Sequence, residues 1–216
     1  MENFYTIKNE EIEEIVEKKS RFIATIFNVE DIEQAEQKIK EIKKKFHDAK
    51  HNCIAYRVLE KGQIIEKSSD DGEPSGTAGA PMLNVLQKNR ICNIVVIVTR
   101  YFGGVLLGTG GLVRAYTEVT QKAIEKSDLI YKVEGFEVEI SIDYPNFEFF
   151  KYYCKTNDIK IIEIEYLENI NIKIEIEKDR KNILLNDIET KSINIKKILG
   201  FKDKYINKTV EKINKW

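Results

Sequence analysis

Three carboxylates stand within four residues of one another, at Asp70, Asp71 and Glu73. Crowded carboxylates can bind Mg²⁺, or can act as an acid and a base, because neighbouring like charges push their pKa values apart. They can equally pair with Arg100 or Arg114, or with backbone N–H groups of a nearby glycine-rich loop. Both interpretations stay open, and we favour the structural pairing. Arg114 also has Glu118 four residues further on, with which it could pair along a helix.

Eight of the eleven glycines lie between Gly72 and Gly111, in two loops at residues 69–79 and 100–111. Glycine is favoured where φ is positive or where the backbone approaches another group closely. The second loop precedes a predicted helix, whose first N–H groups could hold an anion. However, neither loop contains GxxxxGK[ST] or GxGxxG, so a nucleotide-phosphate site lacks its usual motif. Tight packing of strands, helices and loops is the simpler explanation of these glycines.

The remaining candidates for chemistry are weak. His47 and His51 have the spacing of two metal ligands on a helix, but no third ligand accompanies them, so packing, capping or substrate contact is favoured. The cysteines form no CxxC pair, and neither a zinc site nor a disulfide framework is predicted. No GxSxG motif supports nucleophilic hydrolysis. The sequence predicts no metal and no cofactor, and leaves enzymatic activity uncertain with a preference against it.

The length, the composition and the net charge of the chain are those of a globular protein. A chain of 216 residues with 42% hydrophobic residues can bury a proper core, and a net charge of −1 excludes a strongly basic DNA-wrapping protein. A local basic patch is compatible with this sum. The longest strongly apolar run, at residues 94–98, is too short to cross a bilayer, and the N-terminus does not resemble a secretory signal. We therefore expect a soluble cytoplasmic protein with no membrane association and no DNA-specific signal.

Hydrophobic periodicity predicts an α+β fold with two domains, at residues 1–130 and 131–216. Strand pairs are expected within residues 4–29, turning near Lys19, and at residues 52–59 and 63–67. Apolar residues at helical spacing predict a helix over residues 31–46, and others begin near Pro81 and after the second glycine loop. The β-branched run at residues 94–98 predicts a strand covered on both faces.

The second half alternates in a β-α-β-β-α-β order, which is the ferredoxin-like arrangement. Its first strand contains Phe136, Pro145 opens the first helix, and the last strand is expected as a short element near residues 193–199. The residues that follow, to Trp216, have a weakly helical pattern.

Five segments together resemble the YigZ/Impact family, and in particular its bacterial YigZ-like members. They are residues 19–24 (KSRFIA), 51–56 (HNCIAY), 70–79 (DDGEPSGTAG), 100–104 (RYFGG) and 107–116 (LGTGGLVRAY). The resemblance covers about residues 15–128. It implies that the first domain has the fold of the second domain of small-subunit ribosomal protein five, and that both domains together are similar to the last two of elongation factor G. Eukaryotic Impact proteins restrain a stress kinase that phosphorylates a translation initiation factor, by competing for its activator.

From these features we expect a non-catalytic binding or regulatory protein that acts near translation and contacts RNA, the ribosome or a protein partner. Arg100, Tyr101, Arg114 and Tyr116 could supply charge-assisted and stacking contacts. The full set of predicted partner-binding residues is His51, Asp70, Asp71, Glu73, Ser75, Thr77, Arg100, Tyr101, Thr109, Arg114 and Tyr116. The alternative is a small-molecule or nucleotide-phosphate enzyme that uses Asp70, Asp71 and Glu73 with the loop from Gly103 to Gly111. The sequence does not predict the oligomeric state.

Overall fold

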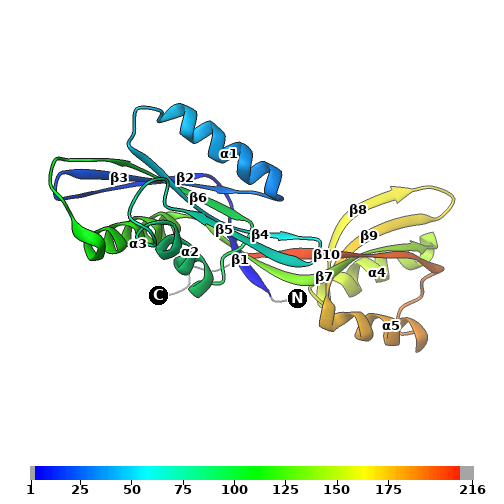
Figure 1. Ribbon diagram of the computed structural model, residues 1–216. Helices are drawn as coiled ribbons and strands as arrows, with labels where there is room; N and C mark the ends of the chain where they lie inside the picture. Colours follow the sequence, from blue (N-terminus) through cyan, green and yellow to red (C-terminus); the bar gives the residue numbers. More distant parts are fainter. Residues whose placement is uncertain (1–2, 210–216) are drawn as a thin grey trace. The chain divides into compact units, whose positions relative to one another are not determined.

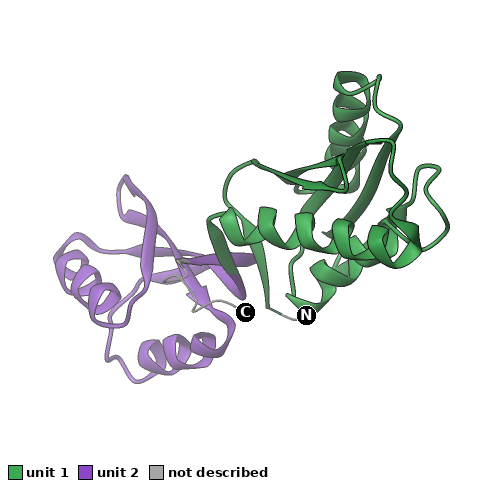
Figure 2. Ribbon diagram, turned by 90° about the vertical axis from the view of Figure 1, so that its left-hand side faces the viewer, with its two compact units in different colours: residues 1, 3–131, 209–216 green, residues 2, 132–208 purple. Residues whose placement is uncertain are grey.

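The computed structural model describes residues 3–209, which divide into two compact units, residues 3–131 with Thr209 and residues 132–208 (Figure 2). The protein is an α+β protein with antiparallel sheets, as predicted. The sheet of the first unit has the order β2-β3-β6-β4-β5. Its strands are β2 (Glu11–Glu17), β3 (Ser20–Asn28), β4 (His51–Glu60), β5 (Gln63–Ser69) and β6 (Ile94–Tyr101), and its helices are α1 (Ile32–Lys45), α2 (Gly79–Lys88) and α3 (Gly108–Lys126).

Strand β6 lies at the centre of this sheet, and the prediction that it is covered on both faces is confirmed. Successive side chains of a strand point to opposite faces. Val96 and Val98 accordingly join the core that contains residues of α2 and α3, whereas Val95 and Ile97 join the core that contains residues of α1. Figure 1 shows α1 on one face of this sheet and α2 and α3 on the other. All the residues from Ile94 to Val98 are fully buried.

The helices begin close to their predicted positions. Helix α1 starts after Asp31, whose carboxylate accepts a hydrogen bond from the Gln34 backbone N–H at 2.7 Å, as expected of an N-cap. Pro81 lies in the first turn of α2, where a missing N–H costs no helical hydrogen bond. One further strand, β1 (Phe4–Ile7), has no counterpart in the prediction, because four residues are too few to establish a period.

The second unit has the predicted βαββαβ order. Its strands belong to a five-stranded sheet of order β1-β7-β9-β8, in which β10 also pairs with β7. Isoleucines on one face of β9 pack with α4 and α5 in a single core. Its elements are β7 (Leu129–Ile142), α4 (Tyr144–Thr156), β8 (Lys160–Tyr166), β9 (Ile170–Glu177), the 3₁₀ helix η1 (Lys178–Arg180), α5 (Lys181–Glu189) and β10 (Lys197–Thr209). Strand β7 starts within the first unit.

The predicted last strand exists, but its predicted bounds are wrong, and residues 200–209 are a strand where a weakly helical pattern was expected. Strand β10 continues for 13 residues instead of ending near Leu199, and no helix follows it within the described residues; residues 210–216 lie outside them. Long-range pairing with β7 decides the conformation here. Ile206 of β10 lies so close to Gly135 of β7 that a Cβ on Gly135 would stand 2.3 Å from the Ile206 side chain.

No helix within residues 3–209 is long and apolar enough to cross a membrane. The likeness to a ribosomal protein and to elongation factor G stays a prediction.

Candidate functional site

The sheet of the first unit brings most of the predicted site residues to one of its ends. Arg100 of β6 is the register partner of His51 on β4 and of Phe22 on β3. We call this end the loop end and define it as the turn at Lys18 and Lys19, residues 46–50, the loops at residues 70–78 and 102–107, and the first turn of α3. It is the end at which β6 leads into α3 (Figure 1).

Glu73 is the centre of a buried polar cluster. Its Oε1 accepts hydrogen bonds from Nη1 of Arg100 at 2.6 Å and from the hydroxyl of Tyr116 at 2.9 Å. The side chains of Glu73 and Arg100 are only 3% and 7% exposed. The guanidinium of Arg100 lies 5.2 Å from the ring centroid of Phe22, and its Nη2 is 3.4 Å from Oγ of Ser20. Glu73 is therefore the counter-ion of a buried arginine.

His51 and Cys53 pack beside this cluster. Nδ1 of His51 lies 2.8 Å from the carbonyl oxygen of Asp71, and its Nε2 lies 3.9 Å from Oε1 of Glu73. The thiol of Cys53 is 3.3 Å from the hydroxyl of Tyr116. Burial raises the pKa of Cys53 to about 12 and also raises the pKa of Tyr116. Neither group is ionised near neutral pH, so neither is poised as a nucleophile.

Asp70 organises the loop in front of α2. Its Oδ2 accepts a hydrogen bond from the N–H of Gly76 at 2.8 Å, and its Oδ1 accepts from Ala78 at 3.0 Å and from Gly79 at 2.8 Å. Burial alone would raise the pKa of Asp70, but the three hydrogen bonds outweigh it and lower that pKa. The negative charge also lies at the positive end of the helix dipole. Asp70 thus caps α2 from eight residues upstream of its N-cap.

Asp71 ties this loop to two other elements. Its Oδ1 accepts a hydrogen bond from Nζ of Lys43 at 2.6 Å, and its Oδ2 accepts from the backbone N–H of Asn52 at 2.7 Å. Burial would raise the pKa of Asp71, but Lys43 and the Asn52 N–H lower it overall. Each of the three carboxylates therefore has its own partners. No group of three His, Cys, Asp or Glu residues within residues 3–209 could hold a metal ion.

The other predicted residues divide into buried and exposed ones. Tyr116 is fully buried, and the Thr77 hydroxyl donates to the carbonyl oxygen of Pro74 at 2.6 Å. The Tyr101 hydroxyl donates to Asp48 at 2.9 Å. The exposed ones are Ser75, Thr109 and Arg114.

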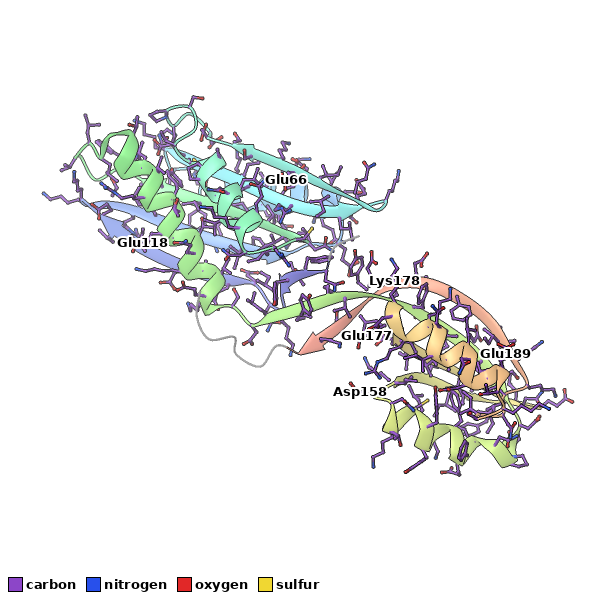
Figure 3. All side chains as sticks on the ribbon, turned by 90° about the horizontal axis from the view of Figure 1, so that it is seen from below. Glu66, Glu118, Asp158, Glu177, Lys178 and Glu189 are labelled. Carbon is purple, nitrogen blue, oxygen red and sulfur yellow. The ribbon has the colours of Figure 1, made fainter. Side chains whose placement is uncertain are left out.

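Arg114 does not pair with Glu118, because Glu118 forms an ion pair with Lys122, 2.8 Å away, on the outer side of α3 (Figure 3). Arg100 and Tyr116 lie inside the unit, so they can position a surface but cannot form one.

Sequence reasoning missed the residues that shape the surface of the loop end. Oγ of Ser20 accepts a hydrogen bond from the N–H of Gly103 at 3.2 Å, and a Cβ on Gly103 would lie 2.0 Å from the backbone of Lys19. Beyond this anchored base, the loop exposes Phe102 at 43%, Val105 at 41% and Leu106 at 83%. The signal available in the sequence was an apolar run, Val105 to Leu107, inside a glycine-rich loop.

The open face of the second unit has a different character. Its register rows place Glu137 beside Glu175 and Lys160, and Glu139 beside Lys173 and Glu163. Ion pairs link many of these residues, including Lys204 with Glu137 at 3.0 Å and Lys208 with Glu177 at 2.6 Å; Figure 3 labels Glu177. These rows have neither the aromatic platform nor the excess of cations that bind single-stranded nucleic acid.

The comparisons with known proteins agree with the division of the chain into two units. Residues 18–124 match the family model of the Impact N-terminal domain, and residues 140–189 match a domain of unknown function, DUF1949. The Impact family member YvyE of Bacillus subtilis (strain 168) is 37% identical over 182 residues, which cover 84% of this chain and 83% of that protein. The chain belongs to the Impact family.

Two further relatives of this Impact family chain span most of its length. The family member YigZ of Escherichia coli (strain K12) is 34% identical over 164 residues, covering 76% of this chain and 79% of that protein. A crystal structure described as that of a hypothetical protein is 29% identical, with a TM-score of 0.60, and covers 90% of this chain and 97% of that one. The predicted family and the two-domain fold are therefore confirmed.

Proposed function

We propose that this Impact family chain is a non-catalytic binding protein that acts near translation in the cytoplasm and contacts its partner through the loop end. One observation carries the proposal. The groups at the loop end that could do chemistry are occupied by the protein itself, whereas apolar and cationic side chains beside them are exposed. Such an arrangement suits recognition better than a reaction.

Family membership supports the link with translation. The Impact homolog of Dictyostelium discoideum is 41% identical over 97 residues, which cover 44% of this chain and 28% of that protein. Eukaryotic Impact proteins act on the control of translation initiation, as the family resemblance implies. The shared segment is shorter than the first unit, and a partner-binding role of the first unit is the simplest function that both groups could have in common.

The proposal is tested by co-sedimentation of the full chain with purified ribosomes and with polysomes at increasing salt concentration. We expect salt-sensitive association, because exposed cations contribute a screened attraction. Association should weaken when Lys50 and Arg114 are both changed to Glu, and should persist in Lys40→Glu, an exposed position on α1 away from the loop end. Absence of the chain from ribosomal, polysomal and initiation-factor fractions at low salt would overturn the proposal.

A further inference from the structure

We propose that the loop end binds an acidic segment of a protein partner, with Leu106 as the apolar anchor of the contact. This inference rests on the proposed function and specifies the chemistry of its partner. It rests on the shape of the loop at residues 102–107, on the charges around the loop and on the cations that lie against the aromatic rings beside it.

The loop presents apolar side chains from a fixed base. Leu106 is 83% exposed, although leucine is a residue that proteins usually bury. The base is fixed because the Gly103 N–H donates to Ser20 and because Gly103 lies directly against the Lys19 backbone. A contact held in position before binding loses less conformational entropy when the partner arrives.

The charges around the loop favour an acidic partner. Two carboxylates of the loop end are neutralised by ion pairs, Asp71 by Lys43 and Glu73 by Arg100. The other two, Asp48 and Asp70, accept hydrogen bonds from the Tyr101 hydroxyl and from backbone N–H groups and keep their charge. By contrast, four exposed cations near the loop make no ion pair within residues 3–209; they are Lys18, Lys19, Lys50 and Arg114.

Two further features bear on this balance. Three carboxylates, Glu17, Asp48 and Asp70, also make no ion pair within residues 3–209, and the four cations outnumber them. The first turn of α3 has no acidic residue and no side-chain cap, so the positive end of its dipole is uncompensated.

The aromatic rings argue for a protein over RNA. The ring centroid of Phe102 lies 5.6 Å from Nζ of Lys50 and 5.7 Å from the guanidinium of Arg100. The ring centroid of Tyr101 lies 5.7 Å from the guanidinium of Arg21. Both rings are therefore already in contact with cations of the protein itself. Base recognition needs ring faces for stacking or hydrogen bonds to base edges. Val105 and Leu106 supply neither, but they suit an apolar pocket surrounded by a polar rim, which is the usual composition of a protein interface.

The inference is tested by selecting peptides from a random twelve-residue phage library on the immobilised full chain, followed by fluorescence anisotropy with the selected peptides. We expect enrichment of Asp and Glu together with Leu, Ile or Phe. Leu106→Ser should weaken binding about tenfold, as for an interface anchor, and the double variant Lys50→Glu, Arg114→Glu should do the same. The matched controls are Leu167→Ser, an exposed leucine of the second unit, and Lys40→Glu; both should bind normally.

Selected peptides without acidic enrichment, or binding unchanged in Leu106→Ser, would overturn the inference. A hairpin RNA is tested in parallel. RNA binding that the charge-reversal variant abolishes and Leu106→Ser leaves intact, with no acidic peptide selected, would overturn the acidic-protein partner while leaving the proposed function in place. Acidic-peptide binding with no association with ribosomes or initiation factors would remove the link to translation and retain the docking surface.

Discussion

Nη1 of Arg100 donates a hydrogen bond to Oε1 of Glu73 across 2.6 Å, and both side chains are more than nine-tenths buried. A buried pair of this kind contributes little over an apolar pair, but removing one member leaves a charge without its partner in a poorly solvated place. The pair joins β6 to the loop at residues 70–78 and makes that loop part of the core.

Glu73→Ala should therefore destabilise the protein by about 3–5 kcal/mol, because Arg100 would be left buried and unpaired. Urea unfolding followed by circular dichroism measures the change. Glu73→Gln is the matched control, since it keeps the shape and an acceptor oxygen and should cost less. A loss below about 1 kcal/mol in Glu73→Ala would mean that Arg100 finds water or another acceptor.

Asp70→Ala should cost about 1–3 kcal/mol, because three backbone N–H groups at the start of α2 lose their acceptor. The pKa of Asp70 is lowered below its ordinary value of 3.8 in the folded protein. Its contribution is therefore present above that value and is lost as the pH falls through the folded pKa. Unfolding curves of wild type and Asp70→Ala should converge as the pH is lowered from about 5 toward this range. A difference that stays constant with pH would contradict the role of the charge.

Gly103→Ala should destabilise the protein more than Gly104→Ala. A Cβ at position 103 would stand 2.0 Å from the Lys19 carbonyl group, so the backbone itself would have to move, whereas nothing lies within 4 Å of a Cβ at position 104. Gly104→Ala has only its positive φ of 81° to accommodate, at a cost of about 1–2 kcal/mol. Thermal unfolding of the two variants side by side provides the measurement. Equal decreases in melting temperature would show that the backbone at the base of the loop can move at little cost.

Cys53 and Cys154 should not react with Ellman's reagent in the native protein at pH 8. Both are buried, and burial raises the pKa of each thiol to about 12, so that the reactive thiolate is scarce. Labelling should begin only on unfolding in denaturant, which serves as the control. Rapid labelling of either cysteine under native conditions would show that its surroundings open readily.

Mg²⁺ with ATP or GTP should leave the melting temperature unchanged up to millimolar concentrations. A ligand that binds the native state raises the melting temperature by mass action, and the three carboxylates already have partners within the protein. Differential scanning fluorimetry is sufficient for this test. A concentration-dependent shift that disappears in Asp70→Asn would favour the alternative of a small-molecule site.

Local patterns in the sequence were enough to predict most of the elements. The β-branched run at residues 94–98 identified β6 as a strand covered on both faces, and the alternation after Phe136 identified the βαββαβ order. The length of strand β10 could not be predicted in the same way, because its polar residues obscure any period and its conformation depends on pairing with a distant strand.

The family and the two-domain α+β fold were determined by the sequence alone, because motif residues and hydrophobic periods are local properties of the chain. The sequence also indicated Arg100, Arg114 and backbone N–H groups as possible partners of the three carboxylates, but it did not assign a partner to each. Only the tertiary structure decided that Glu73 faces Arg100, that Asp71 faces Lys43 and that Leu106 is left exposed. The two ion pairs join residues that are 27 and 28 positions apart in the chain. Such residues meet only after strand register and loop packing have placed them.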